Sequence, residues 1–347
     1  MRVAREHVAW FVHRRAGMSS PATAAIGTSP IVPWWAWVAF AVVVVISLAV
    51  DLVLHRGDRV PSKREGIAWS IGWVAVSLSF GGWVWLQFGG ETAVEFVTAY
   101  LVEKSLSIDN LFVFAVIFGY FAVPKEIQPR VLLFGVIGAL IFRGLFIAVG
   151  AAALGAAGWV IYIFGAFLIF TGYRLARSTG EHVDPSQNKL LLLVRRFVPS
   201  VDEYHGDRVF IRRAGRRLAT PVLGVLLVVA STDVVFAIDS IPAIFAVTDE
   251  AFIVLAANVF AVLGLRALYF VIVGSLDRFQ YLNYGLAVVL GLVGLKMLLS
   301  DVYHPPVYVT LGAVVVVLGV AVLASLWATR NHTEADRIEP GEPVQHP

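Results

Sequence analysis

Long runs of apolar residues, each close to the thickness of a bilayer, recur along almost the whole chain. We count nine, at residues 31–54, 67–88, 94–119, 131–150, 155–174, 220–247, 251–274, 282–299 and 306–328. A helix needs about 20 apolar residues to cross the hydrocarbon core of a membrane. The pattern predicts an all-α integral membrane protein with about nine transmembrane helices in a domain at 31–328. We expect an N-terminal extension at 1–30 and a disordered cytoplasmic tail at 329–347.

Composition agrees with this prediction and narrows the chemistry. The 347 residues are 59% hydrophobic and 15% charged, and they include no cysteine. A disulfide framework and a thiolate metal site are therefore excluded. All eight histidines fall outside the apolar runs, so no imidazole is available within the membrane for zinc or copper. A metal bound at depth would be held by oxygen atoms.

Lysine and arginine collect in alternate connections between the apolar runs. The connections after the first and third runs are basic, and residues 175–219 carry nine Lys or Arg residues. By the positive-inside rule these connections are cytoplasmic, which places the N-terminus on the outer side of the membrane and the C-terminus in the cytoplasm. Four arginines in 1–30 conflict with this orientation. A start at Met18 rather than Met1 would remove the conflict, and both starts remain open.

Paired acids occur within two of the apolar runs at the same spacing of six residues. Glu103 precedes Asp109, and Asp233 precedes Asp239. An ionised acid at the centre of a spanning helix costs ~2.5–3.5 kcal/mol, so four together cost roughly 10 kcal/mol that partners must offset. Clustered oxygen ligands suit a hard divalent cation. We predict that the four carboxylates, with Asn110 as a neutral ligand, bind such a cation.

The acidic pairs belong to a longer internal repetition. Residues 108–111 match 238–241, residues 143–146 match 266–269, and residues 172–174 match 294–296, at offsets of 130, 123 and 122. Three helices in repeat A (94–174) are thus echoed by three in repeat B (220–299). Because three is odd, we expect the halves to insert with opposite orientation, a 3+3 inverted-topology repeat. Secondary transporters use this layout, with the site near the membrane midplane.

Several other polar residues are candidates for supporting the site. Arg143 and Arg266 are expected to be buried counter-charges to the acids, and Ser240 a polar neighbour. Asn258 could be a neutral ligand or a partner in a helix-helix hydrogen bond. The alternative without a functional site is that the acids only form structural salt bridges, with Arg143, Arg266, Arg174 and Lys296.

Other functional classes lack their signatures. No Gly-rich phosphate loop of the Walker kind occurs, and the Gly-x-Gly-Asp arrangement of intramembrane aspartyl proteases is missing around Asp109 and Asp239. We therefore expect no use of ATP by this chain and no enzymatic activity. We also expect no nucleic-acid partner. An anion exporter would bind its substrate with cationic side chains and helix N-termini, whereas here the most deeply placed charges are acidic.

Three long stretches closely resemble the signature sequences of the TerC/Alx family of bacterial integral membrane proteins. They are residues 103–114, 231–245 and 258–270. The resemblance covers about residues 31–328. That family is named for tellurium resistance, and some members are associated with manganese export and with metal supply to secreted proteins. The resemblance implies a divalent-cation pathway at Glu103, Asp109, Asp233 and Asp239.

We expect a carrier that exports Mn²⁺ or a similar hard divalent cation, with no permanently bound cofactor. Moving a dication outward against 100 mV costs about 4.6 kcal/mol, so exchange for protons is the simplest driving force. Its partners would be the lipid bilayer, the cation and protons. The alternative is a membrane scaffold in a stress-response or secretion complex, in which the acids only maintain the fold.

Overall fold

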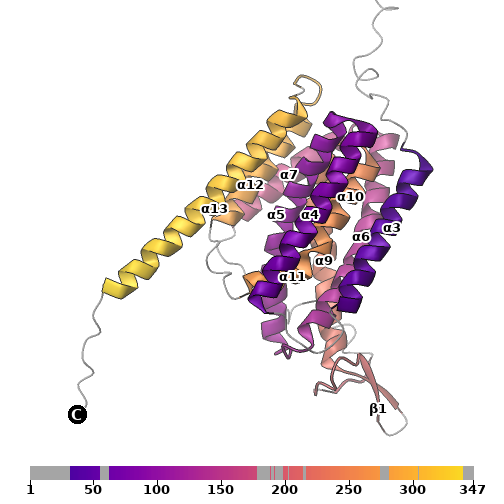
Figure 1. Cartoon of the computed structure of the whole chain (residues 1–347), viewed down its shortest axis with the longest axis vertical. Coiled ribbons are helices and arrows are strands. Elements are labelled where there is room, and N and C mark those ends of the chain that lie inside the picture. Colours follow the sequence, from indigo (N-terminus) through magenta and orange to yellow (C-terminus); the bar gives the residue numbers. More distant parts are fainter. Residues whose placement is uncertain are drawn as a thin grey trace, which may run out of the picture.

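The computed structural model is a helical bundle with a small β-hairpin beyond one end (Figure 1). It describes residues 32–54, 62–177, 188, 191, 198–201, 203–213, 216–273, 281–303 and 305–338, without the side chains of 54, 109 and 329–338. The N-terminal extension at 1–30 and both candidate starts lie outside the described residues. So does much of the connection at 175–219.

Each apolar run predicted from the sequence coincides with a helix or a bent pair of helices. The helices are α3 (Trp34–Leu54), α4 (Lys63–Phe88), α5 (Gly90–Tyr120), α6 (Gln128–Ala156), α7 (Val160–Arg177), α9 (Pro221–Phe245), α10 (Ala251–Leu263), α11 (Leu265–Ile272), α12 (Leu282–Leu298) and α13 (Val307–Ile338). Residue types at the helix ends explain several of these boundaries. Ser62 and Glu65 form a capping box at α4, and proline stands in the first turn of α6 and of α9.

Not every helix has the length and hydropathy of a membrane span. Six of the described helices do, namely α3, α4, α6, α7, α9 and α13, and α10 with α11 would make a seventh if the bent pair is one span. The 31-residue α5 contains five acidic or basic residues, and α12 has only 17 residues. The structure therefore shows a multi-spanning helical protein, while the number nine stays a prediction.

Two local features differ from the sequence prediction. The connection before α9 contains an antiparallel hairpin of β1 (Phe210–Arg213) and β2 (Arg216–Ala219), which the all-α prediction omitted. The tail predicted to be disordered from 329 is helical as far as Ile338, because α13 continues past the apolar run. Residues 329–339 contain no glycine or proline, and a helix already formed is extended at little cost.

Helices of the two predicted repeats pack against each other in a crossed pattern. α5 packs on α10, α6 on α9, and α7 on α12. The tightest contact is in the last pair, where backbones approach closely at glycines. Gly165 faces the carbonyl of Gly294, and Gly172 faces the carbonyl of Ala287. Residues Gly165 and Gly172 correspond, 122 positions later, to Ala287 and Gly294, so this offset turns each of the two contacts into the other. A two-fold axis between the halves would require this exchange. The inverted repeat itself stays a prediction.

We expect the substitution Gly294→Ala to destabilise the protein by about 1–3 kcal/mol, because the core there has no room for a methyl group. A Cβ at this position would lie 2.7 Å from the carbonyl oxygen of Gly165. Gly291→Ala, on the same helix, is the matched control, since a Cβ there has nothing within 4 Å. Thermal unfolding in detergent, followed by tryptophan fluorescence, measures both. A Gly294→Ala protein that melts with the native chain would show that α7 and α12 are not close-packed.

Candidate functional site

One face of α5 carries three buried polar side chains in the middle of the bundle. Glu103, Ser107 and Asn110 follow one another at intervals of four and three residues, so they line one side of the helix. Their exposed fractions are 0%, 0% and 4%. An acid this deeply buried in an apolar helix needs a partner, and the partner comes from the next helix.

The corresponding face of α9 repeats this arrangement. Asp233 and Ser240 stand 130 residues after Glu103 and Asn110, and they are 3% and 2% exposed. Because their spacing is also seven residues, the carboxylate and the hydroxyl share one side of α9. The two acids that begin the sequence pairs thus occupy equivalent places on two helices that are in contact.

Arg143 of α6 joins the two carboxylates. Its guanidinium is 1% exposed, forms a salt bridge with Glu103, and lies 3.4 Å from Oδ1 of Asp233. With its amide oxygen turned toward the guanidinium, Asn110 accepts a hydrogen bond from Arg143 at 3.2 Å. The structure therefore brings together four of the residues predicted from the sequence: Glu103, Asn110, Arg143 and Asp233.

Several buried polar side-chain atoms have no hydrogen-bond partner among the described residues. On the two matching faces of α5 and α9 they are Oε2 of Glu103, Oδ2 of Asp233 and the hydroxyls of Ser107 and Ser240, and on α10 they are the amide oxygen and nitrogen of Asn258. Buried polar atoms are nearly always paired, so a group of unpaired oxygens is unusual. Such a set matches the preference of hard divalent cations for oxygen.

The donor set is smaller than the sequence predicted. No three His, Asp or Glu side chains within the described part of the chain converge as a metal site. The cluster offers two carboxylates and several neutral oxygens, with a guanidinium between the carboxylates. The side chain of Asp109, which was also predicted as a ligand, is outside the part of the chain that the structure describes.

Asp239 lies apart from the central cluster. Its carboxylate is 3.9 Å from the guanidinium of Arg174 on α7, and the side chains are 24% and 65% exposed. The physical reason is helix geometry, because six residues rotate a side chain by about 120° relative to Asp233. α9 continues as a helix through Pro242 and does not turn the two acids toward one point.

Arg266 is a buried counter-charge to a different acid. It is 4% exposed and lies 3.1 Å from Asp51 of α3, a helix outside both predicted repeats. Asp51 was not among the predicted residues, although an acid inside the first apolar run is a visible signal. The two arginines that match in the repeat, Arg143 and Arg266, therefore have different partners.

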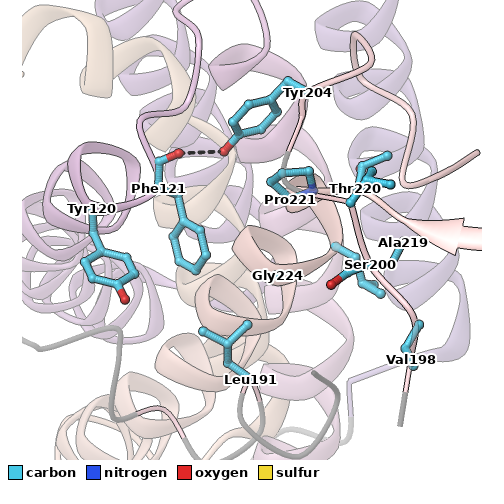
Figure 2. A pocket seen from close by; sticks show the side chains of 12 residues that line it. Tyr120, Phe121, Leu191, Val198, Ser200, Tyr204, Ala219, Thr220, Pro221 and Gly224 are labelled. Carbon is cyan, nitrogen blue, oxygen red and sulfur yellow. Dashed lines mark hydrogen bonds between the residues drawn. The ribbon is translucent and has the colours of Figure 1, made fainter. Parts of the chain in front are cut away.

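A separate cavity of about 280 Å³ lies where the hairpin segment meets the ends of α5 and α9 (Figure 2). The hydroxyl of Tyr204 donates to the carbonyl of Phe121 at 2.9 Å, shown dashed in Figure 2. Burial raises the pKa of Tyr204 to about 12, so it remains a donor at neutral pH. The described residues that line this cavity include Ser200 and Thr220 but no carboxylate, so they are a poor match for a divalent cation.

Known proteins resemble this chain over most of its length. The sequence-family model described as "Integral membrane protein TerC family" matches residues 88–333 of this chain. The uncharacterized membrane protein STKORF319 of Myxococcus xanthus is 43% identical over 305 residues, 88% of this chain and 96% of its own. Alx of Escherichia coli strain K12, named as a candidate membrane-bound redox modulator, is 43% identical over 306 residues, 85% of this chain and 95% of its own.

A more distant relative, a membrane protein of Rickettsia bellii, is 34% identical over 291 residues, which are 84% of this chain and 96% of that protein. No solved structure matches the chain. The family match includes the helices that carry Glu103, Arg143 and Asp233, so the central cluster lies in the part that is shared. This chain belongs to the TerC family of integral membrane proteins.

Proposed function

We propose that the protein is a carrier that exports a divalent cation, Mn²⁺ first among them, from the cytoplasm in exchange for protons. The observation that carries the proposal is the central cluster, in which two buried carboxylates from equivalent positions meet around one positive charge. Carboxylate and amide oxygens suit manganese, magnesium and calcium alike. We name manganese first because the chain resembles a family in which some members are associated with manganese export.

Arg143 acts in this proposal as a tethered cation that fills the site when no metal is bound. Two carboxylates buried together without a cation would be strongly destabilising, and the guanidinium offsets part of that cost. A divalent ion could replace the guanidinium between the carboxylates, using the unpaired oxygens Oε2 of Glu103 and Oδ2 of Asp233. The empty and loaded sites would then both be stable, which a carrier needs in order to return after releasing its ion.

Proton exchange would supply the driving force. Outward movement of a dication costs about 4.6 kcal/mol per 100 mV of membrane potential, negative inside. Asp239 is a candidate proton carrier because it is partly exposed and apart from the central pair. Asp109 is its repeat equivalent and is proposed for the same role. Substituting alanine at either position should reduce metal-dependent proton release.

The name of the Escherichia coli relative refers to redox modulation. This chain contains no cysteine, so it cannot carry out thiol-disulfide exchange with its own side chains. Control of the supply of a redox-active metal would be one route by which a metal carrier affects redox state. That route is compatible with the proposed transport and needs no further site on this chain.

Transport by the purified protein in lipid vesicles tests the proposal. With a pH gradient imposed, we expect uptake of Mn²⁺ together with proton release, and weaker signals with Mg²⁺ or Ca²⁺, relative to protein-free vesicles. If no divalent ion moves in any gradient, transport is the wrong function. A membrane scaffold would then be the better interpretation of the buried acids.

A further inference from the structure

A second positive charge, the ammonium of Lys104, lies inside the bundle against the end of α10. It follows Glu103 directly in sequence but points elsewhere, donating to the backbone carbonyl of Ala261 at 3.1 Å. Lys104 is mostly buried, and no carboxylate among the described side chains pairs with it. A lysine at this depth costs several kcal/mol unless something offsets its charge.

The partner of Lys104 is the end of a broken helix. α10 ends at Leu263, α11 begins at Leu265, and the two helices are bent by 42° at Gly264. The last four carbonyls of a helix have no partner within it, and Ala261 belongs to this last turn of α10. Aligned peptide dipoles add about half a negative charge at this terminus. The break therefore presents a concentration of negative potential to Lys104.

The ammonium of Lys104 fills the space beside Gly264 at the break between α10 and α11. A Cβ at Gly264 would lie 2.8 Å from Nζ of Lys104 and 3.2 Å from Cβ of Trp73. Glycine at this position is therefore what allows the ammonium to reach the carbonyl. Ala261 is ten residues into α10, which is about 15 Å at 1.5 Å per residue and near the middle of a bilayer core.

We propose that the C-terminal end of α10 is a cation-binding position within the membrane and that the ammonium of Lys104 fills it in place of a free monovalent cation. In secondary transporters the ends of interrupted helices bind coupling ions at this depth. Here the cation is attached to the chain. A protein built this way needs no alkali cation for its stability, and it acquires that need when the ammonium is removed.

The test compares Lys104→Ala with Lys104→Met in detergent. The alanine variant leaves room for a free cation, whereas methionine fills the space with an uncharged chain of similar length. We expect Lys104→Ala to melt below the native protein in choline chloride and to recover at least half of the loss in NaCl, KCl or methylammonium chloride at equal ionic strength. Lys104→Met should be equally low in every salt, and the native protein equally high.

Three outcomes would overturn the proposal. One is a Lys104→Ala protein that melts like the native chain in choline. Another is an equal response of the alanine and methionine variants to the small cations. The third is a Lys104→Ala protein that is unfolded in every salt while Lys104→Met is folded, because packing and not charge would then be what the position requires. Melting does not depend on transport, so this test stands even if the proposed function fails.

Discussion

Replacing Glu103 or Asp233 with its amide is expected to abolish cation transport without unfolding the protein. Each amide keeps the size of the acid and removes one of the two charges that meet at Arg143. In Glu103→Gln the guanidinium still has Asp233 as a counter-ion, so one buried positive charge faces one buried negative charge. A dication in that variant would face one carboxylate and a competing guanidinium, which is a strongly unfavourable combination in a medium of low dielectric constant.

The expected effect is large because the charge that is lost is fully buried. Removing one partner of a buried, hydrogen-bonded charge pair costs about 2–5 kcal/mol, so the apparent affinity for Mn²⁺ should fall by at least about thirtyfold. We expect transport in vesicles by Glu103→Gln and by Asp233→Asn to approach that of protein-free vesicles. Thermal unfolding without metal should change little for Glu103→Gln.

Glu91→Gln provides the matched control. Glu91 is on the same helix as Glu103 but is exposed in the first turn of α5, so its amide should transport normally. If both central amides retained native transport, the cluster would be a structural ion-pair network. The buried acids would then serve the fold, as the scaffold alternative holds.

The helices could be predicted from the sequence because an apolar run about as long as a bilayer is thick is typical of a membrane-spanning helix. Each of the nine runs coincides with a helix or a bent pair, and the acids within them were visible as exceptions to the pattern. The bend at Gly264 could not be predicted, because one glycine within an apolar run is equally compatible with a continuous span. The small hairpin was missed for a related reason, since each of its strands has only four residues.

The central cluster was predictable because the sequence repeats it. Equivalent acids on equivalent helices pointed to one shared site, and Glu103, Asp233 and Arg143 do meet. What the repeat could not show is where the imperfect copies diverge. Arg266 pairs with Asp51 from a helix outside the repeat, and Asp239 faces Arg174 instead of the cluster. Asp51 comes from outside the repeated unit, so the repeat gives no sign of its pairing with Arg266.

Replacing Arg143 with methionine is expected to have the opposite effect on binding from the amide variants. Without the guanidinium, two buried carboxylates are left together with no cation between them. Removing one partner from a buried salt bridge costs about 3–5 kcal/mol, so the metal-free variant should melt well below the native protein. A dication would supply the missing charge, and Mn²⁺ should restore much of that stability.

The same change removes a competitor for the site. In the proposed mechanism a cation binds only those molecules in which Arg143 has left the position, so the apparent affinity falls with the fraction of such molecules. We expect Arg143→Met to bind Mn²⁺ at least about tenfold more tightly, which corresponds to a tethered cation that is present at least about 90% of the time. Titration of the melting temperature with Mn²⁺ measures this. Transport should nevertheless be slow, because an ion with no internal replacement is released reluctantly.

Arg266→Met separates this effect from a general loss of a buried charge. Arg266 is the repeat equivalent of Arg143 and is similarly buried, but its partner is Asp51 and not the central pair. This variant should also lose stability, yet its melting temperature should respond to Mn²⁺ no more strongly than that of the native protein. If Arg143→Met instead bound Mn²⁺ more weakly than the native chain, the guanidinium would be part of the cage that shapes the site. In that case the two carboxylates would depend on Arg143 for their geometry, and a cation could not take its place.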